Sequence, residues 1–204
     1  MPVSTLVLND GTQVPWIAFG TGTALFGKDA THAITVAIEN GFTHLDGAQV
    51  YRNEASLGDG VVASGKPRSE LYITTKLTRL APGETPISAL EKSLERLGMK
   101  YVDLYLVHQA NDHVGKLKEV WKGMEEAKAA GLTKSIGVSN FTADHLNDIL
   151  EVATIIPAVN QVEISVLLSK SLFSSSPAWN RLKLTHTYGK LLDLISHFMK
   201  NIAL

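Results

Sequence analysis

Four polar residues stand where predicted strands end, and their chemistry is complementary. Asp46 lies at the end of one β-prone run, and Tyr51 comes just after it. Lys76 and His108 end the next two runs. An ammonium group close to a phenol stabilises the phenolate, and a carboxylate keeps the ammonium charged and in place. Tyr51 would then be a usable general acid, while the imidazole of His108 could orient a carbonyl oxygen or share the proton.

Each of these residues also has a purely structural interpretation. Asp46 and Lys76 could form a structural ion pair, and Tyr51 could be a half-buried turn tyrosine. His108 could be a hydrogen-bonded residue at a strand end. The convergence of four compatible residue types on one predicted face is what favours catalysis over these alternatives.

A repeated β-α rhythm would position these residues. Short β-prone runs alternate with longer helical stretches and occupy residues 17–20, 44–48, 71–77, 102–108, 135–139 and 157–164. Before them, Asn9-Asp10-Gly11 between apolar residues predicts an N-terminal β-hairpin. We therefore expect an α/β fold of the (β/α)8 TIM-barrel type, incomplete with about six β-α units, in which all strand ends of one sense face one mouth.

An open doubly wound sheet is the alternative arrangement for the same rhythm. The first β-α turn, Gly20-Thr21-Gly22-Thr23-Ala24-Leu25, has leucine where the dinucleotide-binding fingerprint places its third glycine. This turn therefore favours the barrel.

Helix signals support the same rhythm. Thr85-Pro86 gives an N-cap with proline at the first helical position, and the apolar stripe that follows ends at Gly98. A second stripe begins at Leu117 and is closed by Gly131. We predict a helix over 85–97 and another over the stretch before Gly131.

Composition excludes several classes of function. Nineteen Lys+Arg against 20 Asp+Glu leave a net charge of -1, so we expect neither nucleic-acid nor membrane partners. The absence of cysteine excludes disulfides and thiolate metal sites, and the histidines lack metal-ligand spacing, so we expect no metal. The chain start resembles no signal peptide and no apolar run could span a bilayer, which predicts a cytoplasmic protein.

The segment Gly41-Phe-Thr-His-Leu-Asp46-Gly-Ala-Gln-Val-Tyr51-Arg-Asn-Glu54-Ala-Ser-Leu-Gly58 closely resembles the signature of the aldo-keto reductases. Further segments resemble the lysine, histidine and cofactor-contact segments of that family in the same order; they are Ile73–Leu77, Val102–His108, Gly131–Phe141 and Pro157–Glu163. The resemblance implies a barrel that reduces aldehydes or ketones to alcohols by hydride transfer from NADPH.

The resemblance also implies roles for individual residues. The catalytic residues would be Asp46, Tyr51, Lys76 and His108, with Tyr51 as general acid. The residues at the cofactor, NADPH or NADP+, would be Gly20, Thr21, Asp46, Lys76, Ser139, Asn140 and Gln161. His108 and Gln109 would line the substrate pocket for a small carbonyl compound, and we expect a monomer. For Ser139 and Asn140 the alternative is a turn that begins the helix before Thr142.

Residues 165–204 show a different pattern. We expect an aldo-keto reductase domain over 1–164 and a divergent tail with a Ser-rich stretch and a final amphipathic segment over 165–204. We therefore predict a chain that is C-terminally truncated or divergent after about residue 164. The run at 17–26 resembles the fungal branch of the family.

Three hypotheses follow for function. The first is an NADPH-dependent carbonyl reductase with weakened cofactor affinity. The second is a catalytically inactive remnant that acts as a binding or regulatory protein. The third is that the chain forms no stable protein, because an eight-stranded barrel cannot close with six strands.

Overall fold

The computed structural model describes residues 4–162 of the 204-residue chain. It begins with an antiparallel hairpin of β1 (Thr5–Val7) and β2 (Gln13–Pro15), as the Asp10-Gly11 turn predicts. The side chain of Asp10 accepts hydrogen bonds from Lys128 Nζ at 2.9 Å and from Ser135 Oγ at 2.8 Å. These contacts hold the hairpin against residues that lie 118 and 125 positions further along the chain.

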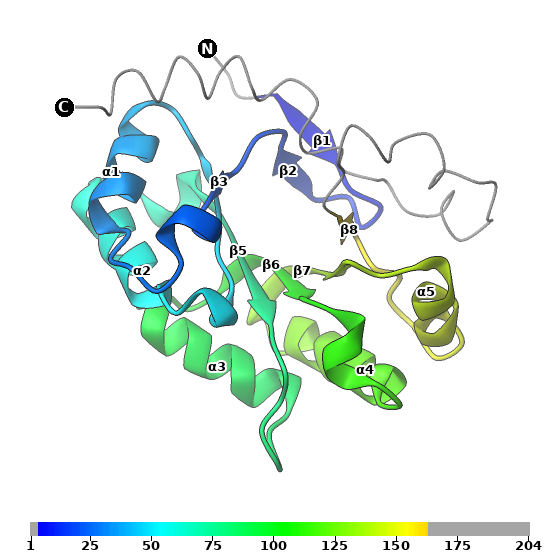
Figure 1. Cartoon of the computed structure of the whole chain (residues 1–204). Helices are drawn as coiled ribbons and strands as arrows, with labels where there is room; N and C mark the ends of the chain where they lie inside the picture. The colour runs from blue at the N-terminus through cyan, green and yellow to red at the C-terminus, as the bar shows by residue number, and fades with distance from the viewer. Residues whose placement is uncertain (1–3, 163–204) are drawn as a thin grey trace, which may run out of the picture.

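Six parallel strands follow the hairpin, and each pairs with the next in sequence order. They are β3 (Phe19–Gly20), β4 (His44–Asp46), β5 (Tyr72–Leu77), β6 (Val102–Val107), β7 (Thr133–Ser139) and β8 (Asn160–Gln161). The sheet curls, and the helices lie along its outer face (Figure 1). The fold is a partial (β/α) barrel, which confirms the predicted fold class.

Helices connect the successive strands. The α-helices are α1 (Thr31–Glu39), α2 (Glu54–Ala63), α3 (Pro86–Leu97), α4 (Leu117–Ala129) and α5 (Ala143–Leu150). Short 3-10 helices are η1 (Thr23–Leu25), η2 (Gln49–Tyr51), η3 (Arg68–Glu70) and η4 (Ala110–His113). Asp46, Lys76, His108 and Ser139 lie at or just after the carboxyl ends of their strands, where barrels place their active sites.

The ends of α3 show why the local sequence was sufficient to place this helix. Thr85 accepts a hydrogen bond from the backbone N–H of Ser88, and Pro86 occupies the first turn. At the other end Gly98 has a φ of +64°, a left-handed conformation that glycine adopts without the cost of a Cβ. The predicted helix over 85–97 is confirmed.

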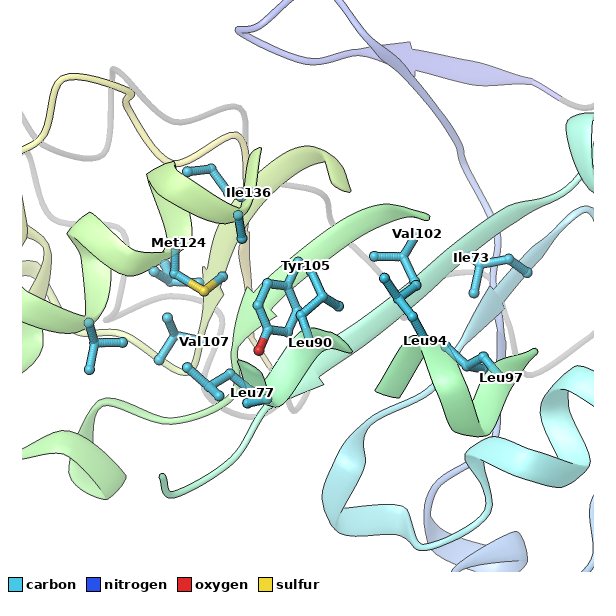
Figure 2. Close-up of a cluster of buried hydrophobic side chains, with 14 of the residues drawn as sticks. Ile73, Leu77, Leu90, Leu94, Leu97, Val102, Tyr105, Val107, Met124 and Ile136 are labelled. Carbon is cyan, nitrogen blue, oxygen red and sulfur yellow. The ribbon is translucent and has the colours of Figure 1, made fainter. Parts of the chain in front are cut away.

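Two apolar layers hold the sheet. The larger one lies between the outer face of the sheet and the helices, and Figure 2 shows part of it, including Ile73, Leu90, Tyr105 and Met124. The smaller one lines the inner face and includes Leu8 of the hairpin region, Leu104 and Val159. Strands covered on both faces consist of buried residues throughout, as in β5 and β6.

Several expectations lie outside the described residues. The domain boundary at 164, the Ser-rich stretch and the final amphipathic segment all fall there. Within residues 4–162, no helix has the length and apolar character needed to cross a membrane.

Candidate active site

A buried ion pair lies at the centre of the candidate site. Asp46 is the last residue of β4 and Lys76 lies one residue from the end of β5, and they are 7% and 1% exposed. Lys76 Nζ donates to Asp46 Oδ1 and also to the backbone oxygen of Gly47, at 3.0 Å in the second case. Gln161 Nε2 donates to Asp46 Oδ2 at 2.8 Å. The ammonium group is thus held at a fixed place at the mouth.

The protonation of Asp46 follows from this environment. Burial by itself would raise the pKa of Asp46, but the charge of Lys76 and the hydrogen bonds from Lys76 and Gln161 bring the pKa below its usual value. Asp46 is therefore a carboxylate at neutral pH, and its charge offsets the cost of burying the Lys76 ammonium.

Tyr51 and His108 lie beside this pair. The Nζ atom of Lys76 is 5.2 Å from the ring centroid of Tyr51. The rings of Tyr51 and His108 are nearly perpendicular, at 86°, with centroids 5.6 Å apart. Within residues 4–162 the Tyr51 hydroxyl has no hydrogen-bond partner, which leaves it available to a small molecule.

His108 follows the last residue of β6 and is partly buried. The pKa of His108 is lowered to about 4, mainly by burial and also by the charge of Lys76, while the charges of Asp46 and Asp112 act in the opposite direction. The imidazole is therefore neutral at physiological pH. A neutral imidazole carries one donor and one acceptor nitrogen, so it can donate a hydrogen bond without adding charge to the site.

Polar groups at the ends of β7 and β8 form a second part of the site. Ser139 ends β7, and its hydroxyl donates to the backbone oxygen of Gln161 at 2.8 Å. Asn140 has a φ of +56°, and its side-chain amide donates to Ser139 Oγ at 3.1 Å and to the backbone oxygen of His108 at 3.3 Å. The α-helix that follows begins at Ala143, so Asn140 is not part of its N-cap.

The loop after β3 contacts Asp46 through Thr21, whose hydroxyl donates to the backbone oxygen of Asp46 at 3.2 Å. Gly20 is exposed, whereas the backbone N–H of the buried Thr21 donates to Asp46 O at 2.9 Å. The amide of Asn53 donates to the backbone oxygens of Thr21 and Leu25, at 2.8 and 2.9 Å. Asn53 thus fixes the 21–25 loop, a role that reasoning from strand ends missed because Asn53 lies two residues beyond Tyr51.

Two apolar side chains near Tyr51 were also missed. Phe26 and Val50 are 46% and 37% exposed. The ring of Phe26 lies 6.4 Å from the ring of Tyr51. Gln109, which we expected at the substrate, is exposed and precedes η4. No local sequence signal links Phe26 to Tyr51, because the two residues are 25 positions apart in the chain.

Metal ligation has no support in the described geometry. Within residues 4–162, no group of three or more histidine, aspartate or glutamate side chains is placed to hold a metal ion.

Comparison with known proteins decides the family. A sequence profile described as the aldo/keto reductase family matches residues 17–177. The chain belongs to this family. The match runs past residue 164, so the expectation that the resemblance ends there is not supported.

Two bacterial members of the family illustrate the similarity in sequence. An aldo-keto reductase of Mycobacterium sp. (strain MCS) is 44% identical over 171 residues, which are 83% of this chain and 60% of that protein. The glyoxal reductase of Bacillus subtilis (strain 168) is 41% identical over 174 residues, which are 83% of this chain and 62% of that protein. The chain thus spans about three fifths of the length of these relatives. The fungal branch expected from residues 17–26 is not supported by these relatives.

Solved structures agree with the fold. An aldo/keto reductase of Brucella melitensis is 33% identical with a TM-score of 0.74 and covers 80% of this chain and 63% of that chain. A Bombyx mori aldo-keto reductase in complex with NADP is 35% identical with a TM-score of 0.71 and covers 80% of this chain and 59% of that chain.

Proposed function

We propose that this aldo-keto reductase chain uses NADPH to reduce small aldehydes or ketones to alcohols. One observation carries the proposal: the buried ion pair of Asp46 and Lys76 holds an ammonium 5.2 Å from the ring of Tyr51, at the mouth of the barrel. His108 completes the group with its ring 5.6 Å from that of Tyr51. Membership of the family supports the same reaction class.

In the proposed mechanism Tyr51 gives its hydroxyl proton to the carbonyl oxygen of the substrate. The charge of Lys76 stabilises the phenolate that remains, and Asp46 holds that ammonium in place. The neutral imidazole of His108 donates a hydrogen bond to the same oxygen and orients it toward Tyr51. The pair of Asp46 and Lys76 is fixed by its hydrogen bonds before the substrate arrives, so little reorganisation accompanies proton transfer.

The nicotinamide cofactor would lie against the ends of β7 and β8. When bound it supplies the hydride that reduces the carbonyl carbon. The hydroxyl of Ser139 and the amides of Asn140 and Gln161 are the donor and acceptor types that fit a carboxamide. Gly20 and Thr21 would contact the cofactor from the loop after β3, and Asp46 and Lys76 would border it.

The apolar rim beside Tyr51 indicates the substrate class. Phe26 and Val50 are exposed next to a group of charged and polar side chains, a combination that suits a small molecule with an apolar body and one carbonyl. His108 would contact the carbonyl oxygen, and Gln109 would lie at the edge of the pocket. Because one relative is named a glyoxal reductase, small dicarbonyls belong in the substrate panel. We also propose a cytoplasmic monomer, which size-exclusion chromatography and fractionation can check.

The test is NADPH oxidation, followed by the loss of absorbance of the reduced cofactor with a panel of aldehydes and dicarbonyls. Tyr51→Phe should lower kcat by about 10²–10⁴-fold, the usual contribution of a general acid. Tyr101→Phe is the matched control, because the Tyr101 ring packs between Arg68 and Lys134, away from the mouth. A folded chain that binds NADPH without turnover would overturn the proposal in favour of an inactive binding protein.

A further inference from the structure

A cavity of about 470 Å³ lies outside the candidate active site, between the start of α2 and the face of α3. The two helices are in close contact at the carboxyl end of α3. There a Cβ on Gly58 would lie 2.2 Å from the backbone oxygen of Leu97, the last residue of α3. The second turn of α2 therefore packs on the carboxyl end of α3. The cavity lies between the first turn of α2 and the part of α3 that precedes Leu97.

Basic side chains gather in this cavity. Three of the four arginines within residues 4–162 line it, and so does one lysine; they are Arg52, Arg79, Arg96 and Lys92. The acidic residues that line it are Glu54 and Glu84. The lining thus has a net charge of about +2, whereas the whole chain has a net charge of -1. This concentration of positive charge favours an anionic ligand.

Two of these cations have structural partners. Arg96 pairs with the buried carboxylate of Glu54 at 2.6 Å, and Lys92 pairs with Glu84 at 2.8 Å. The cations of the lining that remain able to bind a ligand are Arg52 and Arg79. The charges of Arg96 and Lys92 are largely neutralised by these carboxylates. Their side chains therefore shape the cavity wall but add little to the positive potential inside it.

Arg52 and Arg79 are the available cations. Within residues 4–162 the Arg52 guanidinium has no hydrogen bond or ion pair. Arg79 lies 3.6 Å from Asp112, and its side chain is 73% exposed, which makes this a weak pair. A guanidinium presents a planar fork of donors that matches two oxygens of a phosphate group.

Gln49, which lines the cavity two residues before Tyr51, is held by three hydrogen bonds. Gln49 Nε2 donates to the backbone oxygen of Ala89 and to Ser93 Oγ, both at 3.0 Å, and Gln49 Oε1 accepts from the backbone N–H of Thr78 at 3.0 Å. These bonds tie η2 to α3 and to the end of β5. Arg52 is held in a left-handed conformation with a φ of +57° directly after Tyr51. None of the four proposed catalytic residues lines the cavity.

We propose that this cavity is a second site, which binds a small phosphate-bearing anion through Arg52 and Arg79. The ligand is a free phosphate ion or the phosphate group of a small monoester. It binds separately from the cofactor and from the carbonyl substrate. Because anion binding is measured without turnover, the test of this site does not depend on whether the chain has the proposed reductase activity.

The test is calorimetric titration of the 204-residue chain with inorganic phosphate and, separately, with glycerol phosphate, at constant ionic strength set with chloride. We expect saturable binding, and at least tenfold weaker binding by the double variant R52L/R79L. The double variant K100L/K122L removes the same formal charge from exposed lysines outside the cavity and should bind as the unsubstituted chain does. Tighter binding of glycerol phosphate would identify a monoester, and tighter binding of phosphate would identify the free ion.

Three results would overturn the proposal. One is phosphate binding that is equally weakened in K100L/K122L, since that is general charge screening. Another is binding that R52L/R79L leaves unchanged. The last is phosphate binding that saturating NADP+ abolishes, because the anion would then occupy the cofactor site. Circular dichroism of each variant checks that it folds, and R52K/R79K, which keeps the charge but loses the planar fork, should bind with intermediate affinity.

Discussion

The amino and the carboxyl ends of the barrel strands each carry a buried carboxylate that is paired with a cation. The two clusters differ in whether the side chains beside the pair are also engaged by protein groups. At the amino ends, Asp103 accepts from Arg68 at 2.6 Å, from Lys134 at 2.8 Å and from the backbone N–H of Ile73 at 2.9 Å. The Tyr101 ring lies between the two cations, 4.3 Å from Arg68 and 4.7 Å from Lys134. The Asp103 carboxylate is thus fully engaged by protein groups, although Arg68 Nε has no hydrogen-bond partner within residues 4–162.

At the carboxyl ends the ion pair is more deeply buried, since the Lys76 side chain is 2% exposed against 21% for Arg68 and 53% for Lys134. The Tyr51 hydroxyl has no partner within residues 4–162, and the imidazole of His108 is neutral and only partly buried. The same residue types therefore stabilise the fold at one end and are available for chemistry at the other. Position in the barrel, rather than residue type, distinguishes them.

The largest expected effect comes from Lys76→Met. It leaves Asp46 buried without its charge partner, which should lower the free energy of unfolding by about 3–5 kcal/mol. It should also lower kcat per folded molecule by about 10²–10⁴-fold, since the tyrosine loses its adjacent cation. Arg68→Met at the other end is the matched change and should lower stability while leaving kcat unchanged. Equal losses of kcat in both variants would show that the comparison between the two ends is wrong.

Asp103→Asn should lower the free energy of unfolding by about 3 kcal/mol, because Arg68 and Lys134 lose a shared carboxylate while one acceptor oxygen remains. KM and kcat should stay as in the unsubstituted chain. Urea unfolding followed by circular dichroism measures the first quantity, and the NADPH assay measures the others. A stable Asp103→Asn chain with reduced kcat would contradict a purely structural role for the amino-end cluster.

A pH dependence of stability should come from His44, which is buried in the barrel interior next to Thr74 and Tyr72. Burial lowers the pKa of His44 from 6.5 to about 4. Above pH 6.5 neither state is protonated, so stability does not change through this group. As the pH falls from 6.5 to about 4 the unfolded chain takes up a proton that the folded chain does not, and about 2–3 kcal/mol of stability is lost.

Urea unfolding at a series of pH values tests this prediction with His44→Gln as the control, because glutamine keeps a side-chain nitrogen for Thr74 and does not titrate. The slope between pH 6.5 and 4 should become shallower in the variant. His108, His113 and Glu84, whose pKa values are also lowered in the folded chain, contribute over the same pH range in both proteins, so the test is the difference in slope between the variant and the unsubstituted chain. An unchanged slope would mean that another group controls acid unfolding.

The smallest effect is expected for Lys134→Met. Its side chain is 53% exposed, so its pair with Asp103 is worth less than about 1 kcal/mol. The unfolding midpoint should shift slightly, and kcat should not change. A shift as large as that of Arg68→Met would show that the Tyr101 stack, rather than the buried ion pair, holds the amino-end cluster together.

Most of the fold could be predicted from the sequence because its signals are local. The cap of Thr85, the stop at Gly98 and the Asp-Gly turn of the hairpin each act within a few residues. The continuous β-prone runs of β5 and β6 indicate strands buried on both faces. Because Asp46 and Lys76 lie at or near the carboxyl ends of neighbouring strands, the sequence alone predicts that they meet at one mouth of the barrel.

Other features required the tertiary structure, because they depend on contacts between residues far apart in the chain. Gln161 reaches Asp46 across 115 positions, and Asn53 holds the loop that begins at Thr21. The neutral state of His108 depends on how deeply it is buried and on the charge of Lys76. The sequence by itself determined which residues stand at the strand ends; the packing of the barrel decided which of them are already paired, because pairing is set by distances in space.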